Sequence, residues 1–215
     1  MPTVTVYGGA EMIGGNKILL EDEGSRLFFD FGTTFKTRDL YFEEYLSPRP
    51  GAGLLDLLEM DLLPPLEGLY RPDLVPPGET WERCRERPGY REVDGVDGVL
   101  VSHAHVDHTG YISFLREETP VYASAMTAFI AKAMQDSSMA DFEKEVCYLT
   151  PRADDGGYLK TVRGESYHQR PFSFADRETL DEEAREFWDR SPNHVLGQDN
   201  ARRKGLALAS TQPAL

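Results

Sequence analysis

The stretch that decides the fold is LVSHAHVDHTGYI, residues 100–112, where three of the chain's five histidines and one aspartate lie within six consecutive positions. The apolar residues from Val96 to Val101 predict a short buried strand that ends at Ser102, directly before the histidines. Ligand-binding residues of α/β proteins commonly follow the carboxyl ends of strands. We therefore expect a metal-binding cluster at the end of this strand, made of His103, His105, Asp107 and His108.

The spacing within the cluster suggests two ions. In an extended segment alternate side chains point the same way, so His103 and His105 can converge on one ion. Asp107 and His108 follow where the chain turns into a helix, and they can bind a second ion. Imidazole and carboxylate ligands suit Zn²⁺ and also accept Mn²⁺, so the ligand set does not fix the metal. Two ions about 3.5–4 Å apart can share a hydroxide and present it to a phosphoryl or carbonyl centre.

Length and charge limit the classes of protein to be considered. The 215 residues fit one domain, or one domain and part of another, and 40% of them are hydrophobic, enough for a sizeable core. The net charge of −14 indicates a soluble chain that lacks the usual basic surface for nucleic acid. A local site could still bind a phosphate through metal ions.

Targeting and redox signals favour the cytoplasm. No apolar segment of eighteen residues predicts a transmembrane helix, and the N-terminal residues lack the features of a secretory signal. Cys84 and Cys147 lie far apart without a CxxC pairing, which favours free thiols in a reducing, cytoplasmic setting.

Hydrophobic periodicity predicts alternating strands and helices around the cluster. Residues 3–9 and 16–32 predict three strands, the last two joined by a turn at residues 23–25. After the cluster we expect a helix over 109–118 capped by Thr109, a strand over 119–124, and a helix over 124–139 capped by Ser124. The charged amphipathic pattern of residues 177–191 predicts a further helix.

Residues 36–97 have a different character, because proline recurs too often for long regular elements. Their leucine and tyrosine content predicts an ordered excursion over the surface rather than a disordered linker. Short helices are expected around residues 41–45 and 54–61.

The pattern His103-Ala104-His105-Val106-Asp107-His108, after an apolar strand, resembles the signature motif of the metallo-β-lactamase superfamily. RLFFDFGTTF, residues 26–35, is similar to that family's first motif and places its aspartate at Asp30, which the resemblance makes a residue that orients the site by hydrogen bonds. The implied fold class is α+β, an αβ/βα sandwich of which this chain carries the N-terminal half, one mixed sheet flanked by helices. Residues 1–170 would form that half, and residues 171–215 a helical or irregular tail leading to the remainder.

A narrower resemblance concerns VTVYGGAEMIGGNKILLE, residues 4–21, followed by FFDFGTTF. This opening is similar to that of ribonuclease J-like and other β-CASP proteins, which process RNA or DNA. The resemblance implies a metal-dependent phosphodiesterase acting on RNA, or on DNA, with Asp107 and Asp30 in the catalytic machinery. Asp107 could also act as the general base that orients the attacking water.

The chain departs from the family's pattern after His108. The family has a third histidine on the first ion, an aspartate that bridges the ions in an apolar-Thr-Gly-Asp segment, and a further histidine on the second ion. No such segment follows here, and the candidates for the third histidine, His168 and His194, are each more simply read as surface residues. The rest of the site would come from a longer chain or from a partner chain, unless the chain is a degenerate homologue.

Two other functions stay open. One is a small-molecule hydrolase on the same fold, such as a lactonase, thioesterase or β-lactamase, against which only the glycine-rich opening argues. The other is a non-catalytic interaction subunit. An isolated half-sandwich exposes a sheet face, which also predicts self-association into a homo-oligomer.

Overall fold

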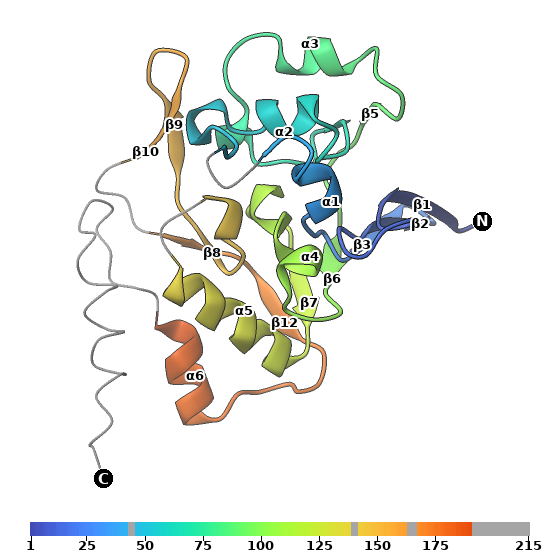
Figure 1. The fold of residues 1–215 in the computed structure, drawn as a ribbon. Coiled ribbons are helices and arrows are strands. Elements are labelled where there is room, and N and C mark those ends of the chain that lie inside the picture. The colour runs from blue at the N-terminus through green and yellow to red at the C-terminus, as the bar shows by residue number, and fades with distance from the viewer. Residues whose placement is uncertain (43–45, 139–141, 163–166, 191–215) are drawn as a thin grey trace.

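The computed structural model describes residues 1–42, 46–138, 142–162 and 167–190. Its largest sheet has six strands in the order β1-β2-β3-β6-β7-β12, with helices and a long irregular segment packed around it (Figure 1). These strands are β1 (Thr3–Gly8), β2 (Lys17–Asp22), β3 (Ser25–Phe29), β6 (Gly98–Leu100), β7 (Val121–Ala123) and β12 (Phe172–Phe174). Neighbours from β1 to β3 are antiparallel and those from β3 to β12 are parallel, which confirms one mixed sheet flanked by helices.

Strands β2 and β3 form a hairpin that the sequence predicts well. Its two connecting residues both have positive φ, 48° at Glu23 and 92° at Gly24. This is the geometry of the two-residue turns that match the right-handed twist of paired strands. The hairpin brings the end of β3, and therefore Asp30, next to β6: the Asp30 N–H donates to the Leu100 carbonyl at 2.9 Å.

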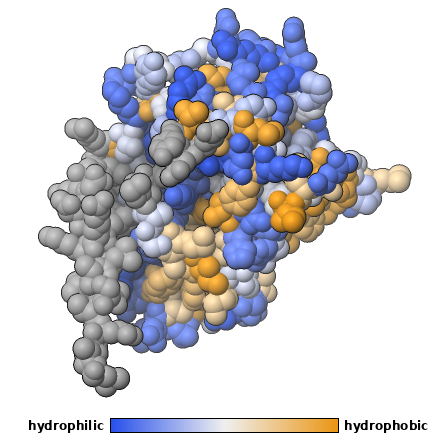
Figure 2. Space-filling model, viewed as in Figure 1, coloured by the Kyte–Doolittle hydropathy of each residue, from blue (hydrophilic) through white to orange (hydrophobic). Residues whose placement is uncertain are grey.

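The two faces of this sheet differ in how they are covered. On one face the register places Leu19 beside Phe28, then Val99 and Val121, and all of these are buried. The opposite face carries apolar residues that are exposed, with relative exposures of 62% at Val4, 49% at Val6, 40% at Phe29 and 36% at Tyr122. Figure 2 shows apolar side chains along the projecting strands β1 to β3. Within the described residues, one side of the sheet is therefore packed and the other is uncovered.

The proline-rich segment contributes to the core, which corrects the expectation that it runs over the surface. It contains α1 (Phe35–Arg38), η1 (Pro50–Ala52), α2 (Leu55–Glu59), β4 (Leu66–Glu67), η2 (Pro72–Leu74), α3 (Thr80–Cys84) and β5 (Arg91–Glu92). Leu54, Leu57 and Leu58 are fully buried in the same cluster as Phe28 and Val99. Helix α2 confirms the helix expected around 54–61, whereas residues 43–45 of the other expected helix lie outside the described residues.

The helix expected over residues 109–118 is wrong. The chain forms α4 (Val106–Thr109), of which Thr109 is the last residue rather than the cap, and then η3 (Ile112–Phe114). Tyr111, Ile112 and Leu115 are all fully buried. Because these apolar side chains are enclosed on every side, their spacing does not report one face of a long helix.

Both later helices begin at side-chain caps, and the cap expected at Ser124 is confirmed. Helix α5 (Ala125–Ser137) begins after Ser124, whose hydroxyl accepts from the Thr127 N–H at 3.2 Å. Helix α6 (Glu182–Asp189) begins after Asp181, whose carboxylate accepts from the Ala184 N–H at 2.8 Å. Side-chain acceptors at this position satisfy N–H groups that have no partner within the helix.

The division into two parts at residue 170 stays a prediction. On the far side of it, β12 adds to the same sheet beside β7. Trp188 of α6 packs on the rings of Phe172, Phe174 and Phe129, at centroid distances of 5.0, 5.2 and 5.9 Å. Residues 171–190 are thus continuous in packing with the sheet.

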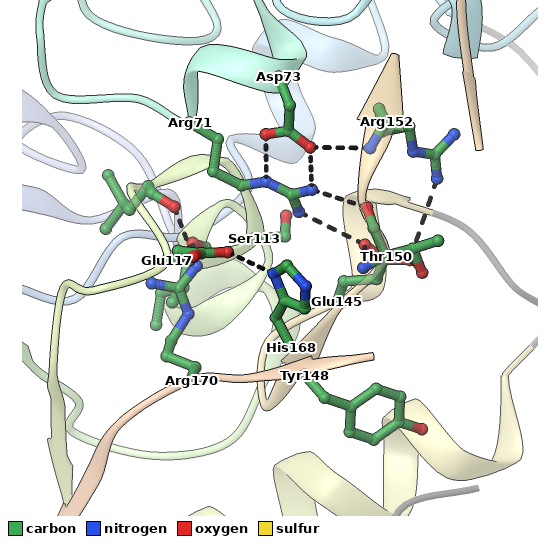
Figure 3. A network of polar contacts seen from close by, with 12 residues as sticks. Arg71, Asp73, Ser113, Glu117, Glu145, Tyr148, Thr150, Arg152, His168 and Arg170 are labelled. Carbon is green, nitrogen blue, oxygen red and sulfur yellow. Dashed lines mark hydrogen bonds and ion pairs between the residues drawn. The ribbon is translucent and has the colours of Figure 1, made fainter. Parts of the chain in front are cut away.

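Two buried arginines join segments that are far apart in the sequence (Figure 3). Arg71 donates to Asp73 and to the Thr150 carbonyl, at 2.6 and 2.7 Å, which ties the proline-rich segment to β8 (Tyr148–Leu149) and β9 (Arg152–Asp154). Arg170 lies between β11 (His168–Gln169) and β12 and donates to four backbone carbonyls, those of Ile112, Leu115, Arg116 and Thr119. Burial lowers the pKa of Arg170 to about 9. The remaining short strand, β10 (Leu159–Thr161), pairs with β9.

In the described part of the chain, none of the helices has the length and apolar character needed to span a bilayer.

Candidate metal centre

The site is built on the loop that follows β6 and on the single helical turn of α4. His105 is the N-cap residue of α4, in an extended conformation with φ −64° and ψ 148°. Its carbonyl accepts the N–H groups of His108 and Thr109 at 2.9 and 3.0 Å. The Thr109 hydroxyl donates to the same carbonyl at 3.1 Å. This compact turn projects Asp107 and His108 from the end of the sheet toward His103.

Three of the four expected ligands form a group that could hold a metal ion. His103, Asp107 and His108 each offer one ligand atom, and these atoms lie within 4.8 Å of one another. The ring centroids of His103 and His108 are 3.9 Å apart. All three side chains are partly exposed, so the group is open to solvent.

Asp30 lies behind His108 and orients it. Its Oδ2 is 2.7 Å from His108 Nδ1, and its Oδ1 accepts from the Ser102 N–H at 2.8 Å. Asp30 is buried and has a φ of 56°, a conformation that Asp tolerates better than most residues. With Nδ1 engaged by the carboxylate, Nε2 of His108 is the nitrogen left to bind a metal, and it lies 3.4 Å from Asp107 Oδ2.

Ser102 is a site residue that the sequence analysis missed. Its hydroxyl donates to Asp30 Oδ2 at 2.9 Å and lies 3.1 Å from Nδ1 of both His103 and His108. It therefore links the carboxylate to the two imidazoles. The only signal in the sequence is a hydroxyl residue between the strand and the first histidine, which is too common to be specific.

His105 is placed differently from the expected pairing with His103. Its ring centroid is 4.8 Å from that of His103, close enough to stay beside the site, but its ligand atoms are not part of the three-residue group. The structure groups His103 with Asp107 and His108 instead. The assignment of His103 and His105 to one ion, and of Asp107 and His108 to another, stays a prediction.

Of the two candidates for a further histidine ligand, the structure describes only His168, and His168 does not belong to the three-residue group. His168 lies on β11, where its Nδ1 is 2.8 Å from Glu117 Oε2 (Figure 3). It lines a separate cavity of about 560 Å³ with Trp81 and Arg71. His194 lies outside the described residues. Among the described residues, the three-residue group is the one cluster of His, Cys, Asp and Glu that could hold a metal.

The glycine-rich opening of the chain packs directly on Asp107. The Gly15 N–H donates to the Asp107 carbonyl at 2.9 Å. A Cβ on Gly14, whose φ is 77°, would lie 2.6 Å from Asp107 Cβ, and a Cβ on Gly32 would lie 1.7 Å from the Asp107 carbonyl oxygen. Glycine at these positions allows the backbone to approach the helical turn closely. The sequence alone does not show what these glycines contact.

The donor set fits a divalent transition-metal ion. Two imidazoles and a carboxylate are the ligands that Zn²⁺ and Mn²⁺ accept, and one of the imidazoles is already oriented by a buried carboxylate. The geometry therefore supports metal binding by His103, Asp107 and His108.

Comparison with known proteins agrees with this chemistry. Residues 72–151 match the family model of the beta-lactamase superfamily domain. The match supports the metallo-β-lactamase superfamily, and the mixed sheet flanked by helices is consistent with that fold. Members of this superfamily are generally hydrolases that bind divalent metals.

A solved structure is also similar, that of a protein of unknown function from Enterococcus faecalis V583. It is 28% identical, with a TM-score of 0.46, and the match covers 66% of this chain and 31% of that protein. The chain therefore spans about a third of the length of the solved protein that it matches. No curated protein matches the chain.

Proposed function

We propose that this chain carries the N-terminal part of a metal-dependent phosphodiesterase site of the β-CASP kind, acting on RNA. The observation that carries the proposal is the group of His103, Asp107 and His108, with His108 held by Asp30, at the end of β6. The contact between the glycine-rich opening and Asp107 supports the narrower assignment, because it makes the segment that resembles β-CASP proteins part of the site's architecture.

Each residue has a distinct role in this proposal. His103, Asp107 and His108 hold the metal, with His105 completing the set when a second ion is present. A bound divalent ion lowers the pKa of water toward about 7 and neutralises charge on a phosphate. The Asp107 carboxylate accepts a proton from the attacking water and orients it. Asp30 keeps the Nδ1 proton of His108 in place, so that Nε2 is the nitrogen that binds the metal.

The remaining ligands come from polypeptide that completes the site, as a continuation of the chain or as a partner chain. The uncovered sheet face that includes Val4, Val6 and Phe29 supports this proposal, because a sheet must bury its apolar side against another layer. A second copy of the chain could also cover this face, which would make the protein a homo-oligomer. The RNA-binding charge would come from the same added polypeptide, since this chain has a net charge of −14.

A second candidate function is a non-catalytic interaction subunit. The observation that favours it is the presence, among the described residues, of only one ligand group, with three members. Metal content separates the two functions: fewer than one ion per chain by elemental analysis would support the non-catalytic subunit, or a broken site, over the hydrolase.

The test of the proposal compares wild type with Asp107→Ala on three substrates. We expect Zn²⁺- or Mn²⁺-dependent cleavage of a 5′-labelled RNA and no turnover of nitrocefin or a thioester. Asp107→Ala should abolish RNA cleavage with an unchanged circular dichroism spectrum, and Glu118→Ala, an exposed carboxylate elsewhere, should retain it. RNA cleavage by Asp107→Ala at the wild-type rate would refute the assignment, and turnover of nitrocefin or thioester alone would favour the small-molecule hydrolase.

A further inference from the structure

Lys17 is a buried ammonium without a carboxylate partner in the described part of the chain. It lies on β2 with 2% of its surface exposed, and its Nζ donates to the Gly15 carbonyl at 3.3 Å and to the Thr34 hydroxyl at 3.2 Å. The ring of Tyr111 also lies near this group, with its centroid 5.0 Å from Nζ. Burial lowers the pKa of Lys17 to about 7. An ammonium is costly to bury, so its place here calls for a reason beyond the filling of space.

The helical turn of α4 that carries Asp107 and His108 is called the ligand turn below. The two groups that Lys17 binds belong to two loops that hold this ligand turn in place. One is the loop of Gly14 and Gly15, whose Gly15 N–H donates to the Asp107 carbonyl at 2.9 Å. The other is the loop from Phe31 to Thr34. In it the Phe31 N–H donates to the His108 carbonyl at 2.9 Å, and the Thr33 N–H donates to the Val106 carbonyl at 3.0 Å. Lys17 therefore joins, through one nitrogen, the two backbone segments that fix the main chain of Asp107 and His108.

We propose that Lys17 is a positioning residue, which holds these two loops together and so places Asp107 and His108 for metal binding. The inference rests on the proposed metal site. Lys17 touches neither the metal nor the substrate and acts only through the two loops. An apolar side chain of similar length could fill the same space, but it could not donate to a carbonyl and a hydroxyl at once.

The alternative is that Lys17 only stabilises the fold, and the two roles differ in what Lys17→Met would change. Methionine removes a buried charge and keeps most of the volume, a change that is often neutral or stabilising. A residue with a purely structural role would thus alter the unfolding midpoint and leave metal affinity alone. A positioning residue would weaken metal affinity without a matching loss of stability.

The experiment is a Co²⁺ titration of the full chain, followed by the visible absorption of the bound ion. We expect wild type to bind Co²⁺ at His103, Asp107 and His108. Lys17→Met should bind it about 10- to 100-fold more weakly, with an altered spectrum, as observed when residues that orient metal ligands are removed. Urea unfolding in EDTA should show that the apo variant is as stable as wild type or more so.

Lys132→Met is the matched control. Lys132 is equally buried, on α5, where its Nζ donates to Asp136 at 2.7 Å and to the Arg190 carbonyl at 2.8 Å. This variant should change stability but keep the wild-type affinity and spectrum. Thr34→Val serves as a second variant if Lys17→Met does not fold. It removes one acceptor from the Lys17 ammonium and should weaken Co²⁺ binding in the same direction.

The outcomes distinguish a failure of the proposed metal site from a failure of the role proposed for Lys17. If wild type fails to bind Co²⁺, the proposed metal site fails and the role of Lys17 fails with it. If wild type binds Co²⁺ and the folded Lys17→Met variant, or Thr34→Val in its place, matches it in affinity and spectrum, only the role of Lys17 is overturned.

Discussion

Asp30 Oδ2 lies 2.7 Å from His108 Nδ1, and this pair joins the end of β3 to the ligand turn after β6. The two residues are 78 positions apart in the sequence, and the parallel pairing of β3 with β6 brings them together. A carboxylate in this place fixes which nitrogen of the imidazole carries the proton and holds the ring in one orientation. The metal-facing nitrogen of His108 is thus set by a residue that does not itself need to bind metal.

The first prediction concerns Asp30→Asn. Asparagine tolerates the φ of 56° at this position, so the backbone should be retained, but the neutral amide no longer stabilises the Nδ1 proton of His108. We expect Zn²⁺ affinity to fall about 10- to 100-fold, measured by competition with a chromophoric chelator. Asp30→Gly, which also accepts positive φ, should lose at least as much affinity. Wild-type affinity in both variants would contradict the role given to Asp30.

The sequence predicts the parts of this fold whose signals are local. The β2–β3 hairpin follows from alternating residues around Glu23 and Gly24, and helix α5 follows from its cap at Ser124. The cluster of histidines after β6 follows from an apolar run that stops abruptly at Ser102. In each case a short stretch of sequence contains both the element and the residue at which it begins or ends.

Contacts between distant segments were not predictable in the same way. Leu54 and Leu57 lie in a proline-rich segment whose irregularity suggested a surface path, and only the folded structure shows that they enter the main core. Tyr111 and Ile112 suggested a helical stripe because full burial imitates periodicity over a short stretch. Asp30 was identified through a family resemblance, whereas nothing in the sequence links Ser102 to its two histidines.

The second prediction concerns Gly32, which lies against the ligand turn. An alanine Cβ would lie 1.7 Å from the Asp107 carbonyl oxygen, and a backbone atom cannot move aside as a flexible side chain can. We expect Gly32→Ala to lower the free energy of unfolding by about 3 kcal/mol or more, measured by urea denaturation. Gly51→Ala is the control, because its nearest neighbour is the exposed side chain of Tyr158, at 3.2 Å, and its cost should be below about 0.5 kcal/mol. Equal stabilities of the two variants would contradict the packing described here.

The third prediction separates His168 from the metal centre. Its imidazole pairs with Glu117 and lines the cavity that contains Trp81, so His168→Ala should leave Zn²⁺ affinity within twofold of wild type. His103→Ala should reduce it at least tenfold in the same titration, because it removes one of three ligands. A large loss of affinity in His168→Ala would instead place it among the ligands, as one reading of the sequence allowed.

The fourth prediction tests the hairpin turn. Glu23 has a φ of 48°, which asparagine adopts more readily than glutamate, and Asn-Gly is a favoured pair in such turns. Glu23→Asn should raise the free energy of unfolding by about 0.5–1 kcal/mol, measured by urea denaturation. Glu178→Asn makes the same change of charge at an exposed residue without positive φ, and it should have no comparable effect. Equal shifts in both variants would mean that charge rather than turn geometry is responsible.

The fifth prediction is a pH dependence that originates at Lys17. Burial lowers the pKa of this group to about 7 in the folded protein, whereas the unfolded chain keeps a value near 10.5. Between pH 7 and about 10.5 the unfolded state keeps the proton of Lys17, whereas the folded state loses it. The free-energy cost of burying the ammonium is therefore complete below pH 7 and shrinks as the pH rises. The contribution of Lys17 to the free energy of unfolding should therefore increase from pH 7 to 8.5, by up to about 1.4 kcal/mol per pH unit.

Comparison with Lys17→Met isolates the contribution of Lys17, because both chains share every other titrating group. Arg170, whose pKa burial lowers to about 9, contributes equally to the two and mostly above this range. Urea unfolding in EDTA at half-unit steps should give a wild-type curve that rises relative to the variant. Parallel curves from pH 7 to 8.5 would show that Lys17 keeps its proton in the folded state, and that its contacts with Gly15 and Thr34 stabilise the charge more than burial penalises it.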